Sequence, residues 1–93
     1  MRGVPNAKIK KFKNAFGCDP PLLERGYMPL VVSTTLAKLA EHIVRLQRSG
    51  TNPKDVLRAK SKFWTTRRAA KECGFRVVGG LKQWIKNLEP MWP

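Results

Sequence analysis

Acidic residues are scarce in this sequence. Its 93 residues include 19 Lys or Arg but only six Asp or Glu, which gives a formal net charge of +13. Six carboxylates leave few candidates for general acid–base pairs or for Mg²⁺ ligands. Because a chain this basic repels itself, we expect an acidic partner: RNA, DNA, an anionic membrane surface or an acidic protein.

Other absences exclude further classes of function. The sequence has no run of about 18 apolar residues, so we expect no membrane span. Its two cysteines, Cys18 and Cys73, lie far apart and form no CxxC pair, which argues against a zinc site and a disulfide framework. Gly79-Gly80 lacks the spacing and the following Lys-Ser/Thr of a phosphate-binding loop. His42 is the only histidine, and it is expected at a helix edge and not in a catalytic or metal site. We therefore expect no enzyme, no cofactor, no metal and no small-molecule substrate.

The length and the apolar periodicity predict one small, mainly α domain. We expect three to five helices, with an extended basic N-terminal segment and an irregular Pro-rich connection. We therefore divide the chain into a basic segment over residues 1–16, a connection over 17–33 and a small helical domain over 34–93. The basic segment has the charge of an organelle transit peptide but lacks the serines of one, so we expect it to be retained.

Two helices are expected before residue 50. The first covers residues 6–16, with Asn6 as its cap and its lysines on the sides away from an apolar stripe. The second covers residues 34–49, with Ser33 or Thr34 as its cap and a full core-facing apolar stripe.

Asn52 and Pro53 are typical of a helix start, because asparagine caps the first turn and proline fits the first helical position. From there apolar residues keep a spacing of three and four positions up to Gly74. The pattern predicts either one long helix or two, with Thr65 or Thr66 capping the second.

A last helix is expected over residues 81–90, after an extended stretch and a turn over 77–80. Trp84 is expected in the core on this helix, and Trp92 is expected to anchor the tail on a neighbouring molecule. Trp64 is either a core residue or a platform on which a base stacks.

The most basic stretch of the sequence is VLRAKSKFWTTRRAAK, residues 56–71, with six Lys or Arg and no acid. At about 100° per residue, Val56, Phe63 and Ala70 share one narrow side of a helix and the cations almost encircle it. A helix with one side in water usually mixes both charge signs on that side. The pattern therefore favours phosphate contact over a merely solvated face.

Scattered cations with interleaved aromatic residues suit RNA packed in an assembly. The expected RNA contacts come from the two basic blocks and one aromatic: Arg2, Lys8, Lys10, Lys11, Lys13, Arg58, Lys60, Lys62, Trp64, Arg67, Arg68 and Lys71.

Other partners are open at this point. Residues 66–86, TRRAAKECGFRVVGGLKQWIK, partly match a helix-turn-helix motif, which would make the chain a DNA-binding protein. An adaptor for an acidic protein is a third hypothesis. A basic N-terminal helix lying on an anionic membrane is a fourth, although its apolar side is narrow.

Two segments carry a resemblance to a known family. RGVPNAKIKKF at residues 2–12 resembles the RGVPxAKIRxF opening of the archaeal and eukaryotic large-subunit ribosomal protein of the sixteen/ten-e family, and MPLVVS at 28–33 is similar to its FPLxxxxVS region. The resemblance covers about a dozen residues well and roughly 40 loosely, and the chain is shorter than the family. It implies a ribosomal class, with rRNA contacts at Arg2, Lys8, Lys10 and Lys11.

From these patterns we predict a structural constituent of a ribosome that binds rRNA through Lys and Arg contacts with phosphates. Its partners would be ribosomal RNA and neighbouring ribosomal proteins. The chain does not match the bacterial or cytosolic ribosomal proteins along its length, so a mitochondrial ribosome in the matrix is the first expectation and a cytoplasmic ribosome the second.

Overall fold

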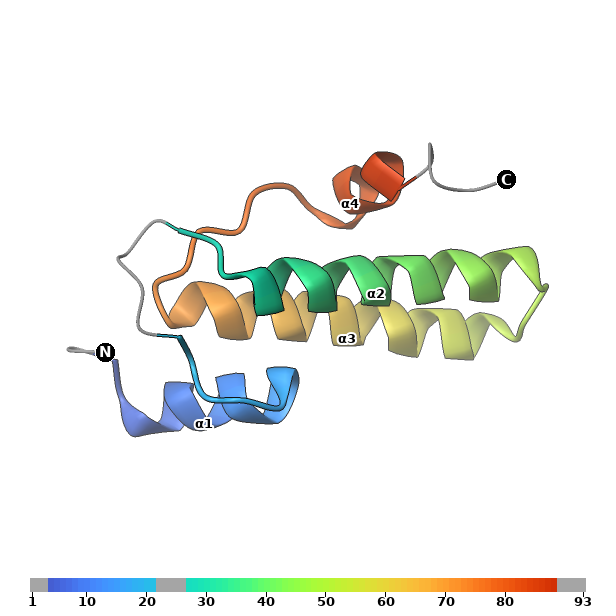
Figure 1. The fold of residues 1–93 in the computed structure, drawn as a ribbon. Helices are drawn as coiled ribbons and strands as arrows, with labels where there is room; N and C mark the ends of the chain where they lie inside the picture. The colour runs from blue at the N-terminus through green and yellow to red at the C-terminus, as the bar shows by residue number, and fades with distance from the viewer. Residues whose placement is uncertain (1–3, 22–26, 89–93) are drawn as a thin grey trace.

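The computed structural model describes residues 4–21 and 27–88, and these residues form helices and connections without a strand. The helices are α1 (Asn6–Phe16), α2 (Leu30–Arg48), α3 (Pro53–Glu72) and α4 (Leu81–Leu88). Helices α2 and α3 lie antiparallel and side by side, with α1 against α3 and α4 against α2 on the opposite side (Figure 1). The arrangement confirms the expected mainly α class.

A short connection over residues 49–52 joins α2 to α3. Gly50 has φ 69°, a left-handed conformation that glycine adopts without strain at a helix end. The Asn52 side chain accepts a hydrogen bond from the backbone N–H of Lys54 at 3.0 Å, and Pro53 occupies the first helical position. The predicted start of the third helix is therefore confirmed.

Helix α2 begins at Leu30, about one turn before the predicted start, so the expected cap at Ser33 or Thr34 is wrong. The Ser33 hydroxyl donates a hydrogen bond to the backbone carbonyl of Leu30 at 3.0 Å, inside the first turn. Val32 is fully buried, and this burial explains why the helix extends through β-branched residues that weakly oppose it. The connection that begins at residue 17 is shorter than expected.

Helix α3 is continuous from Pro53 to Glu72, so the alternative with a second helix starting at Thr65 or Thr66 is wrong. Thr66 is 3% exposed and lies in the core-facing row with Phe63 and Ala70. The narrow apolar side that the sequence predicted for this helix therefore does face the core.

All four helices and the 73–80 connection contribute to one core. Its buried members are Phe12, Val32, Leu36, Ala40, Ile43, Phe63, Ala70, Cys73, Phe75, Val77 and Leu81. Trp84 packs against this cluster from α4 as a half-buried residue, in agreement with its predicted place. Trp92 and the predicted helix end at Pro90 lie outside the described residues.

Helix α1 is part of this body and not a separate arm. Phe12 is fully buried, and its ring centroid lies 4.4 Å from that of Phe16 and 5.6 Å from that of Phe75. Pro5 occupies the cap position and Asn6 is already helical, so the predicted cap at Asn6 is wrong by one residue. The described part of the basic N-terminal segment thus presents its lysines from a fixed helix.

The connection between α3 and α4 covers residues 73–80. It is anchored by a hydrogen bond from the backbone N–H of Arg76 to the Tyr27 carbonyl at 3.2 Å. A helix-turn-helix motif joins its helices by a turn of about three to four residues. The longer connection here leads α4 onto α2, so residues 66–86 do not have the geometry of that motif.

Candidate nucleic-acid interface

The cations of α3 carry charge that no acid in the described residues neutralises through an ion pair. The ion pairs between described residues join Lys13 with Asp19 at 3.9 Å and Arg45 with Glu41. Neither pair includes a residue of α3. An exposed and uncompensated row of cations is the feature that attracts phosphate groups.

A groove of about 510 Å³ lies between α1 and α3. We call it the α1–α3 groove, and its lining residues are Lys11, Asn14, Ala15, Ser61, Lys62, Thr65, Thr66, Arg68, Ala69 and Glu72. Three cations from two helices meet there with the acid Glu72 and with neutral side chains that donate hydrogen bonds, so the cations outnumber the acid among the lining residues. Phosphate oxygens accept hydrogen bonds from both kinds of group.

Three neutral residues of this groove, Asn14, Ser61 and Thr65, were not among the sequence-predicted contacts. Their positions become visible only when α1 is placed against α3. A weak signal was present in the sequence, because Ser61, Thr65 and Arg68 follow one another at helical spacing.

A smaller hollow of about 350 Å³ lies beside Trp64. We call it the Trp64 hollow, and it is lined by Trp64, Arg67, Arg68 and Lys71. The Trp64 side chain is 46% exposed, so the structure places it outside the core. This exposure rules out the core alternative for Trp64, and base stacking on its ring stays a prediction.

Arg58 and Lys62 line a third hollow together with Asp55 and with His42, which is exposed at the edge of α2 as predicted. Because Lys62 also lines the α1–α3 groove and Arg68 also lines the Trp64 hollow, the three depressions share their boundaries. They form a basic path along α3 from Arg58 to Lys71. At 1.5 Å per residue, this path is about 20 Å long.

Arg67 differs from the other predicted contacts because its guanidinium is engaged inside the protein. Its Nε donates a hydrogen bond to the carbonyl of Gly79 at 3.0 Å, and its Nη2 donates to the carbonyl of Val77 at 3.4 Å. The guanidinium carbon also lies 5.6 Å from the centre of the Trp64 ring. Arg67 therefore holds the 77–79 backbone beside Trp64.

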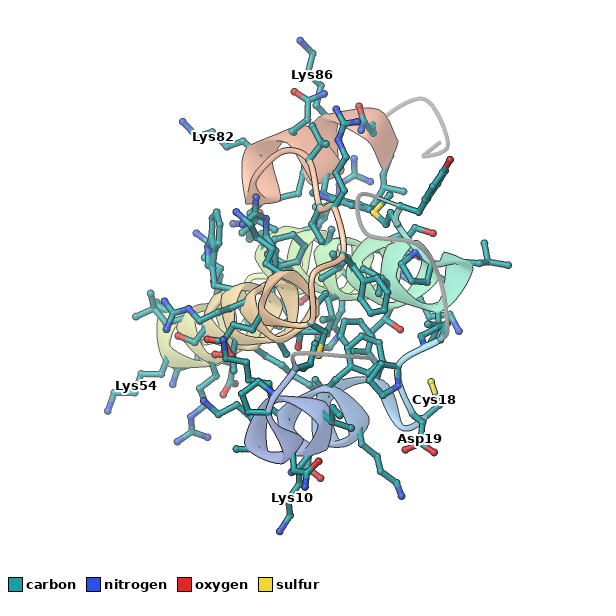
Figure 2. All side chains as sticks on the ribbon, turned by 90° about the vertical axis from the view of Figure 1, so that its left-hand side faces the viewer. Lys10, Cys18, Asp19, Lys54, Lys82 and Lys86 are labelled. Carbon is teal, nitrogen blue, oxygen red and sulfur yellow. The ribbon has the colours of Figure 1, made fainter. Side chains whose placement is uncertain are left out.

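The remaining predicted contacts are distributed around the molecule. Lys10 and Lys13 are exposed on α1, and Figure 2 shows Lys10 pointing away from the body. Lys8 and Lys60 are half-buried. Arg2 lies outside the described residues. The structure thus brings together Lys11, Lys62 and Arg68 in the groove, while Lys10 and Lys13 lie outside it.

Cys73 is fully buried and its thiol donates a hydrogen bond to the carbonyl of Lys8 at 3.6 Å, as expected for a structural thiol. Burial raises the pKa of Cys73 above its ordinary value of 9.0, and the nearby Glu72 carboxylate adds to the shift while Lys8 opposes it. A raised pKa keeps the thiol protonated at neutral pH. The protonated thiol stabilises the folded state fully at pH values below the pKa of Cys73 in the unfolded chain. This stabilisation is lost as the pH rises through the higher pKa that Cys73 has in the folded protein.

We expect the two cysteines to react with a thiol reagent at very different rates at pH 8. Cys18 is exposed and should react at once, whereas Cys73 should react only when the protein unfolds or opens locally. Ellman's reagent should therefore titrate one thiol in the native protein and two in urea. The Cys18→Ser variant serves as the control, and a fast reaction of that variant in buffer would contradict the buried position of Cys73.

Within residues 4–21 and 27–88, no helix combines the length and apolarity needed to cross a membrane. In the same part of the chain, no three His, Cys, Asp or Glu side chains gather in a way that would hold a metal ion. Comparisons of the chain with protein-family models, curated proteins and solved structures find no match. The basis for a function is therefore the chemistry of the α1–α3 surface.

Proposed function

We propose that this protein is a structural constituent of a ribosome and binds rRNA through α1 and α3, without catalysis. The basic path from Arg58 to Lys71, with Lys11 facing it from α1, is the observation that carries the proposal. Its cations form no ion pair with an acid among the described residues, so phosphates supply the missing counter-charge. We place the protein in a mitochondrial ribosome, with a cytoplasmic ribosome as the alternative.

Two features favour RNA over a specific DNA sequence. The basic residues line depressions on the sides of packed helices, and no isolated helix is presented to a major groove by the described residues. The segment considered as a helix-turn-helix has an eight-residue connection, 73–80, in place of a tight turn. RNA with irregular backbone geometry fits such depressions better than a straight duplex does.

Neighbouring ribosomal proteins form the second class of partner in this proposal. Tyr27, Leu30 and Val78 are apolar side chains with more than half of their surface exposed. The hydrogen bond between Arg76 and Tyr27 joins the two segments that carry them. Apolar surface of this kind is what protein contacts cover in an assembly.

We expect an epitope-tagged form of the protein to sediment with a ribosomal subunit in a sucrose gradient of mitochondrial lysate. RNase treatment should move it to the light fractions, because the proposed contacts are made with RNA. The measurement is an immunoblot of gradient fractions against markers of both subunits, with a parallel gradient of cytoplasmic lysate.

A light peak that RNase does not shift would overturn the proposal. A heavier complex that survives RNase would indicate an acidic protein partner, and release by DNase would indicate DNA. Each of these results contradicts rRNA as the main partner.

A further inference from the structure

We propose that the Trp64 hollow binds one unpaired nucleobase stacked on the Trp64 indole, so that the RNA strand taken by this protein is single-stranded at that point. The inference rests on the proposed function, because it names the form of RNA that the same surface recognises.

The Trp64 indole is exposed and yet fixed in place. Almost half of its surface, 46%, is open to solvent. Its ring meets the Phe63 ring edge-on, with centroids 5.7 Å apart and an interplanar angle of 88°. A flat aromatic group that is already fixed loses little conformational freedom when a base stacks on it.

Gly80 allows this position of the indole. A Cβ atom on Gly80 would lie 2.9 Å from Cη2 of Trp64, closer than real Cβ contacts. The backbone of the connection can therefore approach the ring only because residue 80 has no side chain. Arg67 fixes the same connection through its hydrogen bonds to Val77 and Gly79, so Gly80 and Arg67 act as positioning residues.

The charges around the indole suit a nucleotide. Arg68 and Lys71 line the Trp64 hollow, and no acid of residues 4–21 or 27–88 lines it. Arg68 also lines the α1–α3 groove, so a strand with phosphates in the groove reaches the indole within a short distance. Cations beside an aromatic face are the combination that proteins use to hold single strands.

A duplex cannot use this hollow without opening. Its bases are already stacked on their neighbours, and taking one out costs a few kcal/mol. An unpaired base has a free face for the indole. The hollow should therefore prefer single-stranded over double-stranded RNA. Because every base has a face that can stack, it should show little preference among base sequences.

The test measures binding of fluorescein-labelled RNA by fluorescence anisotropy. One probe is an oligouridine of about 12 nucleotides, within the size range of single-strand sites, and the other is an RNA duplex of the same length. The proteins are the wild type, Trp64→Ala, Gly80→Ala and the double variant. Their folding is checked by circular dichroism, and Trp64→Phe is a further variant that keeps an aromatic ring at the site.

We expect Trp64→Ala to weaken oligouridine binding by about tenfold, in line with the loss of one stacked base, and duplex binding by less than about twofold. Trp64→Phe should fall between the wild type and Trp64→Ala. Gly80→Ala should weaken oligouridine binding in the same direction, because its Cβ displaces the indole. It should add no further loss when Trp64 is already alanine. The salt dependence should not change, since no cation is removed.

Folded Trp64→Ala and Gly80→Ala variants that bind oligouridine as the wild type does would overturn this inference. Equal losses for oligouridine and duplex would also overturn it. In both cases, co-sedimentation with a ribosomal subunit would leave the proposed function standing. Absence of binding to either RNA, with a light RNase-insensitive peak in the gradient, would overturn both.

Discussion

Replacement of Phe12 by alanine is expected to lower the free energy of unfolding by about 3–5 kcal/mol, the usual cost of truncating a buried phenylalanine. The Phe12 side chain is fully buried and contacts Phe16 and Phe75, so its removal leaves a cavity between α1 and the rest of the core. A domain of this size has a total stability of roughly 5–14 kcal/mol. The variant should therefore be largely unfolded at much lower urea concentrations than the wild type.

Urea denaturation followed by circular dichroism measures this loss. Lys10→Ala is the matched control, because Lys10 lies on the same helix with its side chain exposed (Figure 2). The control should change the free energy of unfolding by no more than about 0.5 kcal/mol. A loss below about 1 kcal/mol in Phe12→Ala would mean that α1 is not an integral part of the fold.

The double variant Lys11→Gln and Lys62→Gln should bind single-stranded RNA about 25-fold more weakly than the wild type at about 0.1 M salt. Each phosphate contact on a single strand contributes about 0.7 to the slope of log K against log salt concentration, which is about fivefold in affinity at this salt. Both lysines line the α1–α3 groove, so the slope should become shallower by about 1.4.

Lys82→Gln with Lys86→Gln is the control of identical charge change. Figure 2 shows these two lysines pointing outward from α4, on the side of the molecule opposite α1. The control should retain most of the affinity, whereas general attraction to the net charge would weaken both variants equally. That equality would contradict the groove as the binding surface, and a wild-type slope of about −1 or shallower would contradict phosphate binding by a set of cations.

Local chemistry explains which parts of the fold could be predicted. The start of α3 depends on Asn52 and Pro53 alone, and both act within one turn. The start of α2 depends on the burial of Val32 against residues from other helices, which no local pattern contains. Ser33 was misleading because its hydroxyl bonds a backbone carbonyl inside the helix, as serine also does near helix ends.

From the sequence, the site could be predicted only for the third helix taken alone, without the segments that pack against it. The helical wheel indicated that cations almost encircle this helix, and most of these cations are exposed. It could not indicate that the 77–79 backbone covers one side of α3 and engages Arg67. Nor could it indicate that Lys11 meets Lys62 and Arg68 across a groove, since that meeting depends on how α1 packs. The exposure of Trp64 likewise depends on the path of the connection.

The position of α1 has a consequence for the order of folding. Helices α2 and α3 are neighbours in the chain and can pair through short loops, whereas the hydrogen bond from Cys73 to Lys8 joins residues 65 positions apart. Contacts between distant residues form later because closing a long loop costs more entropy. During translation α1 is synthesised before α3. Helix α1 is therefore made before the helix against which it packs, and it can take its place in the core only once α3 is complete.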